Sequence, residues 1–303
     1  MNIKLLALGI GLALGLSTPI VLAQEKDHKI KVSTQFMVEV NLNPKNIVSL
    51  DFGALDTLKT LGVSVKAYPK ESTPNYLKSF VKDTDINAGG MKTPNFDELK
   101  ALKPELIIIT GRQGSHFLEL SNIAPTLNLN IDSNNYFESV KKNALILASL
   151  IEQTPLAETK LAALESKAAK FKELAAKSSS KTLVLLHNDG NLMVLTKGGY
   201  TSIIFDLLGL PKAETTIFTE RKLADSAYLN TLNPDYIFLI DRSSAIGQKA
   251  ISMDVFKDTA LANVAAIKNK KTFILQPDLW YLSGGGLESL DLQLDEIISN
   301  FKP

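Results

Sequence analysis

The sequence predicts an α/β protein of two lobes with parallel sheets, joined by one long rigid helix, with a ligand cleft between the lobes. Two observations support this fold class. Residues 95–112 and 225–242 form an internal repeat, in which apolar, proline and arginine positions recur in the same order. A strongly helical segment without glycine lies between the two copies, at residues 155–177. Each copy is therefore expected to belong to a lobe of its own.

Each copy of the repeat reads as a short helix followed by a strand. Two leucines three positions apart precede a proline, as in Leu99 and Leu102 before Pro104. This is the spacing of the buried face of a helix that a proline ends. A continuous apolar run follows, at residues 107–109 and 237–240. Such a run after a helix is typical of a parallel strand that is covered on both faces.

The remaining patterns set the expected domain boundaries. We predict an N-terminal lobe over residues 24–153, an inter-lobe helix over 154–180 and a C-terminal lobe over 181–303. The inter-lobe helix keeps apolar residues at helical spacing, which favours a stiff strut over a flexible linker. Further elements are expected as a hairpin at 29–42, strands at 182–186 and 272–275, and a closing helix at 287–301.

The first 23 residues have the pattern of a signal peptide. A basic start, an apolar run over residues 5–16 and small residues before residue 24 fit an exported protein. The alternative, a membrane anchor, needs a longer run of about 20 residues. The chain has no cysteine, so no lipid anchor is expected. We expect a periplasmic monomer, and the formal net charge of +1 argues against nucleic acid as a partner.

Two arginines occupy equivalent places in the repeat. Arg112 and Arg242 each follow directly on a predicted parallel strand. The carboxyl ends of such strands are where open α/β sheets bind ligands. Arginine suits planar oxygen anions because it is always charged, offers forked donors and stacks on aromatic rings. The sequence therefore predicts that both arginines face one cleft, with surface ion pairs as the alternative interpretation.

A second candidate cluster is the pair Trp280 and Tyr281, which precedes a glycine-rich turn at residues 284–286. A tyrosine oxygen is a hard donor that suits Fe(III), and a tryptophan face can stack on an aromatic ligand. The alternative is that both aromatic side chains only pack against the glycine turn.

Other chemistry has little support in the sequence. The histidines His28, His116 and His187 are too scattered to predict a divalent metal site. The motifs of common hydrolases and the phosphate-binding P-loop do not occur. An exported hydrolase is the most distant alternative, so we do not expect an enzyme.

Four segments resemble the periplasmic catecholate siderophore-binding proteins. They are residues 48–58, 107–113, 234–242 and 280–289, and they occur in the order of that family. The resemblance covers essentially the whole mature chain. It implies the helix-strut class of ABC solute-binding proteins, which deliver their ligand to an inner-membrane ABC importer. The implied ligand is an Fe(III)–siderophore complex for iron transport, without a resident cofactor. The same fold also serves haem, cobalamin or ferric citrate, which are the alternatives.

The resemblance also assigns residues. In the family, arginines surround a ferric tris-catecholate, and a Tyr and a His complete the iron shell when the siderophore supplies four oxygens. Arg112, Arg242 and Tyr281 match three of these positions. Tyr200 stands where an arginine is common, and Glu220 stands where the histidine is expected. An oxygen of Glu220 or Tyr200 could replace the imidazole, or only hexadentate complexes are bound.

Three more assignments complete the comparison with this family. Arg221, beside Glu220, could restore a positive charge. The family docks on its permease through one acidic residue on each lobe, and here Asp97 and Glu98 match the first lobe. Asp225 is the candidate on the second lobe. The alternative is that Asp97 and Glu98 only favour the start of a helix.

Overall fold

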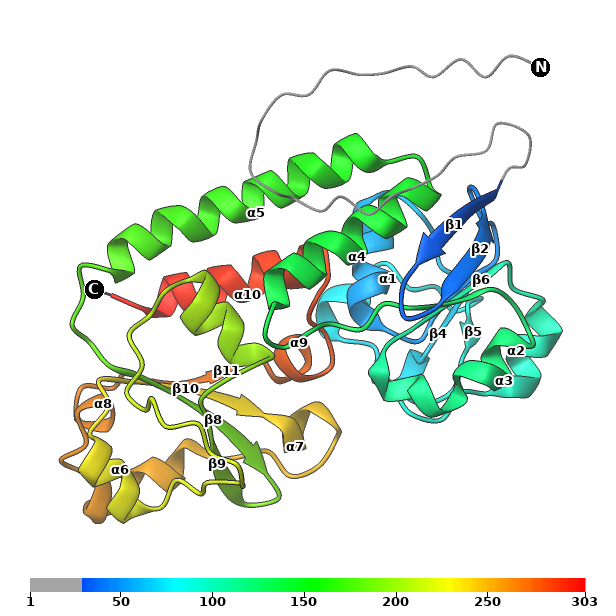
Figure 1. The fold of residues 1–303 in the computed structure, drawn as a ribbon. Coiled ribbons are helices and arrows are strands. Elements are labelled where there is room, and N and C mark those ends of the chain that lie inside the picture. The colour runs from blue at the N-terminus through cyan, green and yellow to red at the C-terminus, as the bar shows by residue number, and fades with distance from the viewer. Residues whose placement is uncertain (1–28, 303) are drawn as a thin grey trace, which may run out of the picture.

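The computed structural model describes residues 29–302, and the predicted signal peptide at residues 1–23 lies outside them. Figure 1 shows two α/β lobes beneath one long helix, α5 (Thr154–Ala175), which runs along both. Pro155 lies in the first turn of α5, where its missing N–H is not needed. The fold class that the repeat predicts, with two lobes and parallel sheets, is confirmed.

The first lobe contains a sheet of five parallel strands in the order β5-β4-β3-β6-β7. The strands are β3 (Ile47–Ser49), β4 (Ala67–Tyr68), β5 (Ile86–Asn87), β6 (Leu106–Ile109) and β7 (Thr126–Asn128). The central strands β3 and β6 are buried along their whole length, as expected for parallel strands that are covered on both faces.

The second lobe contains a sheet of four strands in the order β11-β10-β8-β9. The strands are β8 (Thr182–Asn188), β9 (Asn191–Leu195), β10 (Tyr236–Asp241) and β11 (Thr272–Leu275). Strands β8, β10 and β11 are parallel, whereas β9 runs antiparallel to β8 after a two-residue turn. Both turn residues, Asp189 and Gly190, have positive φ (50° and 77°), which suits the turn type of a tight hairpin. This antiparallel edge strand was not predicted from the sequence.

The internal repeat is visible as two copies of the same unit. Helix α2 (Phe96–Leu102) precedes β6, and helix α6 (Ser226–Leu232) precedes β10. Each helix ends at a residue with left-handed backbone, Lys103 or Asn233, directly before the proline. Proline disfavours helical backbone in the residue before it, so both helices stop at the same point.

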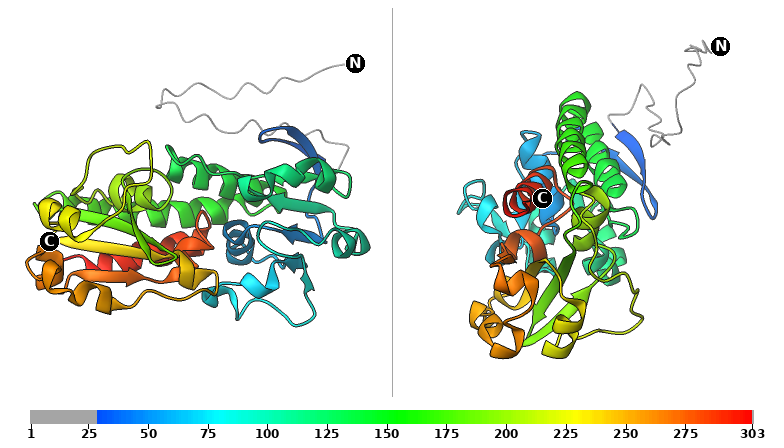
Figure 2. Two further views of the ribbon diagram at one scale, coloured as in Figure 1. Left: turned by 90° about the horizontal axis from the view of Figure 1, so that it is seen from below. Right: turned by 90° about the vertical axis from the view of Figure 1, so that its left-hand side faces the viewer.

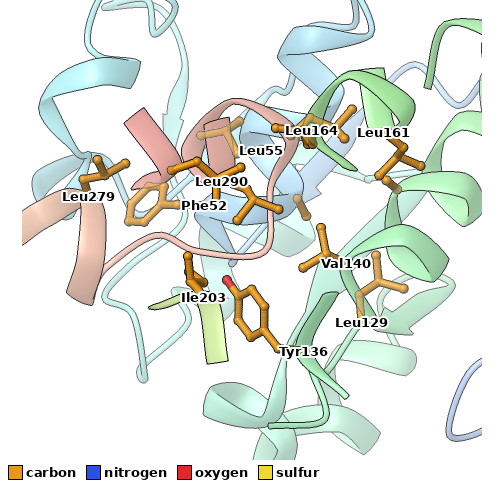
Figure 3. Packing of buried hydrophobic residues seen from close by; sticks show 14 of the residues in the cluster. Phe52, Leu55, Leu129, Tyr136, Val140, Leu161, Leu164, Ile203, Leu279 and Leu290 are labelled. Carbon is orange, nitrogen blue, oxygen red and sulfur yellow. The ribbon is translucent and has the colours of Figure 1, made fainter. Parts of the chain in front are cut away.

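One apolar core extends from the first lobe into the second. Helix α1 (Phe52–Thr60) packs on α4 (Tyr136–Leu150) and α10 (Leu287–Asn300), and α5 packs on both of the latter. Figure 3 shows Phe52 and Leu55 of α1 among Leu164 of α5 and Leu290 of α10. A shared core opposes large independent movements of the lobes, because separating them would expose apolar surface to water.

The smaller elements complete the chain. Strands β1 (Lys29–Ser33) and β2 (Met37–Asn41) form the predicted hairpin, which Figure 2 shows outside the sheet of the first lobe. The short α-helices are α3 (Phe117–Ser121), α7 (Arg242–Ala245), α8 (Ala265–Lys268) and α9 (Pro277–Tyr281). The 3₁₀ helices are η1 (Lys70–Ser72), η2 (Asn75–Leu77), η3 (Gly111–His116), η5 (Met253–Lys257) and η6 (Thr259–Leu261), and η4 (Ser202–Leu207) is a π-helix. Within residues 29–302, no helix combines the length and the apolar character that crossing a membrane requires.

Candidate functional site

A cavity of about 590 Å³ lies between the lobes, at the carboxyl ends of β8 and β10. Lys92 reaches it from the first lobe, and the second lobe supplies the other side chains. They are Leu186, Asn188, Met193, Val194, Leu195, Thr219, Glu220, Arg221, Arg242 and Tyr281. Four residues singled out from the sequence thus line one cavity, at the strand ends where α/β sheets bind ligands.

Tyr281, at the end of α9, is the residue on which Arg112 and Arg242 converge. Arg242 Nε donates to the phenol oxygen of Tyr281 over 2.8 Å, and Arg112 Nη2 donates to its carbonyl oxygen over 2.9 Å. The guanidinium carbons of Arg242 and Arg112 lie 5.5 and 5.9 Å from the centroid of the tyrosine ring. Both are cation–π distances, so the ring lies beside two positive charges.

The local fold fixes Arg242 at the start of α7. Asp241 ends β10 and caps α7, since its carboxylate accepts the backbone N–H of Ser244 over 3.1 Å. Arg242 follows at once and is half-buried. Its Nη1 donates to Oδ1 of Asn188, the last residue of β8. The guanidinium group is therefore held between Asn188 and Tyr281, both of which line the cavity.

Arg112 lies in η3, directly after β6, and connects the two lobes. Buried Gln113 anchors this helix by donating to the carbonyl oxygens of Leu50 and Met91 over 3.0 and 2.6 Å. From there Arg112 reaches across to the carbonyl oxygens of Tyr281 and Leu282, the latter over 3.3 Å from Nη1. Arg112 thus links the first lobe to the backbone of the second lobe beside the cavity.

Tyr200 lies beside the two arginines but is not among the residues that line the cavity. Its hydroxyl donates to the carbonyl oxygen of Tyr281 over 3.4 Å, and the two ring centroids are 6.3 Å apart. Burial raises the pKa of Tyr200 despite the nearby positive charge of Arg112. The phenol therefore stays neutral at physiological pH and acts as a hydrogen-bond donor.

Every arginine of the chain lies at this cleft. The sequence contains three, Arg112, Arg221 and Arg242, among 33 basic residues, so the other 30 (33 − 3) are lysines. Arg221 and Arg242 line the cavity, and Arg112 contacts Tyr281 beside it. Lysine provides surface charge, whereas arginine adds a planar fork that matches oxygen anions. Restricting arginine to one cleft indicates a binding site for such an anion.

Comparison with known proteins assigns the family. The family model described as "periplasmic binding protein" matches residues 47–279. The chain belongs to this family. The petrobactin-binding protein YclQ of Bacillus subtilis is 36% identical over 263 residues, which are 86% of this chain and 83% of YclQ. The ferric-anguibactin-binding protein FatB of Vibrio anguillarum is 28% identical over 286 residues, covering 89% of each chain.

Solved structures agree with this periplasmic binding protein in fold. The crystal structure of YclQ matches with a TM-score of 0.85 and 33% identity, covering 95% of this chain and 100% of the crystallised chain. The siderophore-binding protein BauB, solved with acinetobactin and ferric iron, matches with a TM-score of 0.82. BauB is 23% identical over 94% of this chain and 99% of its own, so it supports the fold alone.

Two segments that carried the family resemblance pack against each other in this periplasmic binding protein. Gly53, at the start of α1, approaches the glycine turn so closely that a Cβ atom would lie 2.4 Å from the carbonyl oxygen of Gly284. Asp51 caps α1 by accepting the N–H of Ala54 over 2.8 Å. Burial raises the pKa of Asp51, although the Arg112 charge acts to lower it. The two segments together support the wall of the cleft behind Tyr281.

The expectation that Trp280 stacks on the ligand is wrong. Trp280 has 0% exposure, and its indole Nε1 donates to the Glu296 carboxylate over 2.6 Å. Burial raises the pKa of Glu296. Neighbouring residues of a helix point about 100° apart, so in α9 Tyr281 can face the cleft while Trp280 faces the core. The alternative interpretation, packing, holds for Trp280 and not for Tyr281.

Glu220 and Arg221 lie on the exposed loop that precedes α6, and both line the cavity. Glu220 is the one carboxylate among the lining residues, facing the charges of Lys92, Arg221 and Arg242. Within residues 29–302, no three His, Cys, Asp or Glu side chains gather into a metal site.

Asn188 and Lys92 are two of the seven lining residues that were not singled out in the sequence. Asn188 ends the parallel strand β8, so the argument that identified Arg242 would have found it. Lys92 lies in a loop before α2 without any periodic pattern, and only the packing of the lobes brings it to the cavity.

The candidate docking residues lie on the repeated helices of the two lobes. Asp97 and Glu98 are exposed in the first turn of α2. Asp225 is exposed and caps α6 by accepting the N–H of Tyr228 over 2.8 Å. The helix-start interpretation of Asp97 and Glu98 agrees with their place in the first turn of α2 and does not conflict with a contact surface.

Proposed function

We propose that this periplasmic binding protein captures a ferric siderophore of catecholate type in the cleft and delivers it to an inner-membrane ABC importer. The observation that carries the proposal is the convergence of Arg112 and Arg242, one from each lobe, on Tyr281. The names of the relatives YclQ and FatB, which bind petrobactin and ferric anguibactin, support a ferric siderophore as the cargo.

The charges of the cleft fit an anionic iron chelate. Lys92, Arg221 and Arg242 line the cavity with Glu220, and Arg112 adjoins it, so four positive groups face one negative group. A ferric tris-catecholate carries about three negative charges, and burying such an anion without cations would be costly. Guanidinium groups also present flat faces and forked N–H groups to catecholate rings and oxygens.

Tyr281 is the proposed protein ligand of iron when a siderophore leaves coordination positions open. Its phenol oxygen already accepts a hydrogen bond from the Arg242 cation, which suits an oxygen that takes negative charge on binding Fe(III). Glu220, at the rim of the same cavity, is the candidate for a second oxygen. Tyr200 is the weaker candidate for this second oxygen, because it is not among the residues that line the cavity and its hydroxyl donates to the carbonyl oxygen of Tyr281.

Delivery requires contact with the permease. We assign this contact to Asp97 and Glu98 on the first lobe and to Asp225 on the second, because equivalent helices of the repeat present them to solvent. We propose that the protein acts as a monomer in the periplasm, to which residues 1–23 direct its export.

The test is binding by the purified mature chain. Ferric enterobactin and ferric petrobactin are incubated with the protein, and a charge-transfer band that stays with it on a desalting column supports the proposal. The fluorescence of Trp280, the one tryptophan, should be quenched because it adjoins Tyr281. Ferrichrome, ferric citrate, haem and cobalamin serve as comparators. Preferential retention of any comparator would overturn the catecholate assignment.

A further inference from the structure

The ligand-facing pair Asn188 and Arg242 lies between two hydrogen-bonded pairs, of which the His187–Asp241 pair is buried and the Asp189–Ser243 pair is partly buried. Strands β8 and β10 are paired in register, with His187 opposite Asp241. The Nδ1 atom of His187 lies 2.7 Å from Oδ1 of Asp241. The next residues along each strand are Asn188 and Arg242, which bond to each other at the cavity. The following pair is Asp189 and Ser243, whose backbone N–H and Oγ bond over 2.9 Å. Three consecutive residues of one segment thus bind three consecutive residues of the other.

The hydrogen bonds of His187 define its state. The backbone N–H of Gly190 can only donate, and it points at Nε2 of His187 over 3.1 Å. Nε2 therefore carries the lone pair, and the proton lies on Nδ1, which donates to Asp241. The imidazole is neutral and both of its nitrogens are used. Through Gly190 it also holds the tight turn between β8 and β9, next to Asn188.

The carboxylate of Asp241 also has several hydrogen-bond partners. Its carboxylate accepts from His187, from the N–H of Ser244 over 3.1 Å and from the N–H of Ile251 over 2.8 Å. Burial alone would raise the pKa of Asp241, but these hydrogen bonds outweigh it and hold the pKa below its usual range. The carboxylate therefore fixes β8, the start of α7 and the loop at residue 251 to one point, directly behind Arg242.

We propose that His187 and Asp241 are positioning residues for anion binding, because they lock the strand ends that carry Asn188 and Arg242. The expected effect on affinity rests on the proposed function, whereas the hydrogen-bond geometry of His187 and Asp241 does not depend on which ligand is bound. His187 and Asp241 are 4% and 1% exposed, so neither touches a ligand in the cleft. A pair of apolar side chains would pack as well at lower desolvation cost, so packing alone gives no reason for a buried imidazole–carboxylate pair.

Fixing the strand ends that carry Asn188 and Arg242 matters because an unrestrained arginine side chain has many rotamers. A guanidinium group that is already oriented loses less conformational entropy when it binds an anion. Arg242 is held by Asn188 and Tyr281, and Asn188 in turn depends on the end of β8. Loss of the His187 donor would release that strand end, leaving the charge of Arg242 in place but its direction undefined.

The test compares His187→Leu with His187→Asn. Leucine removes both hydrogen bonds, whereas the amide nitrogen of asparagine can replace Nδ1 as the donor to Asp241. We expect His187→Leu to weaken the binding of ferric enterobactin or ferric petrobactin about tenfold by calorimetry, and His187→Asn to recover most of it. In an Arg242→Ala background, His187→Leu should cause little further loss, because it acts through the arginine. Thr126→Val is the control for general destabilisation, since buried Thr126 lies in the other sheet and its hydroxyl donates to the carbonyl oxygen of Ala124.

A second measurement needs no ligand. With three arginines in the chain, the Nε–H region of a ¹⁵N spectrum contains three arginine signals, and Arg242→Lys assigns one of them. The Arg242 signal should exchange slowly with solvent in the wild type and faster in His187→Leu. An unchanged Arg242 signal, or equal losses of affinity from His187→Leu with and without Arg242, would overturn the positioning role. Failure of the wild type to bind any ferric catecholate would instead overturn the proposed function and leave this spectrum informative.

Discussion

Arg242 and Tyr281 form a side-chain hydrogen bond of 2.8 Å between Nε and the phenol oxygen, whereas Arg112 bonds the backbone of the same tyrosine. The repeat makes the two arginines equivalent in sequence, but their contacts differ. Arg242 bonds to the side chains of Tyr281 and Asn188, which line the cavity, whereas Arg112 connects the lobes. Their substitutions should therefore give different patterns of affinity and stability.

Arg242→Ala should weaken binding of a ferric tris-catecholate by about ten- to a hundredfold. Hydrogen bonds to charged groups contribute about 1.5–3 kcal/mol, and about 1.4 kcal/mol corresponds to a tenfold change. Arg242→Lys should recover only part, because an ammonium group keeps the charge but loses the fork. Calorimetry measures both variants, with Lys249→Ala, an exposed change on the same segment, as the control. Wild-type affinity for Arg242→Ala would show that the anion binds elsewhere.

Arg112→Ala should weaken binding by a similar or smaller factor and also destabilise the unliganded protein. Its guanidinium group donates to the carbonyl oxygens of Tyr281 and Leu282 in the other lobe. Losing these bonds should lower the free energy of unfolding by about 1–2 kcal/mol, since the group is half-buried. Urea unfolding of both alanine variants measures the difference. Equal stability of Arg112→Ala and Arg242→Ala would contradict the role of Arg112 as a link between lobes.

The sequence predicted those features that follow from local order along the chain. The repeat has the order helix, proline, strand and arginine, and this order was enough to place Arg112 and Arg242 at strand ends. Each arginine therefore lies at the edge of its own sheet where the parallel strands end. The bounds of α5 lie within one or two residues of the strongly helical segment at 155–177, because helix propensity and spacing decide them, whereas the expected inter-lobe helix of 154–180 extends five residues too far.

Features that depend on tertiary packing were not predicted. The rotation of α9 decides that Tyr281 faces the cleft and Trp280 the core, and no spacing rule distinguishes two adjacent aromatic residues. Lys92 reaches the cavity only because the lobes pack together. The His187–Asp241 contact joins residues 54 positions apart through the register of β8 and β10, which the chain order does not reveal.

Trp280→Phe should destabilise the protein without changing the affinity of the cleft. The indole donates to Glu296, whose pKa is raised by burial, and phenylalanine would leave that carboxyl group without this donor. We expect a loss of about 1–3 kcal/mol in the free energy of unfolding, because the half-buried Glu296 loses the indole donor and keeps only the backbone N–H of Gln276. Thermal unfolding and calorimetry test the two halves of this prediction. If Trp280→Phe instead caused a large loss of affinity at unchanged stability, Trp280 would stack on the ligand despite its buried position.

Asp56 should make stability fall as the pH rises. Burial raises its pKa to about 7, against the hydrogen bonds that it accepts from Ser289, Tyr76 and Glu288. Between about pH 4 and pH 7 the folded protein holds a proton that the unfolded chain has released. The contribution of Asp56 to the free energy of unfolding therefore drops by roughly 4 kcal/mol over this range, about 1.4 kcal/mol for each pKa unit. Asp56→Asn should flatten the profile measured by urea unfolding at pH 5 and pH 8, and an unchanged slope would assign the effect to another group.

Glu220→Gln separates two roles of the one carboxylate that lines the cavity. If the protein binds hexadentate tris-catecholates, Glu220 only repels a trianion, and the change should raise affinity about two- to fivefold. The gain should shrink as salt increases, because Glu220 is exposed and its field is screened within about 10 Å at 0.1 M salt.

If Glu220 instead completes the shell of a tetradentate ferric complex, the same change should weaken that complex while leaving ferric enterobactin bound. Titrating both kinds of complex at low and high salt decides between repulsion and ligation. Arg221→Gln, at the next position in the same loop, is the matched control: it removes a positive charge and should weaken the trianion in either case.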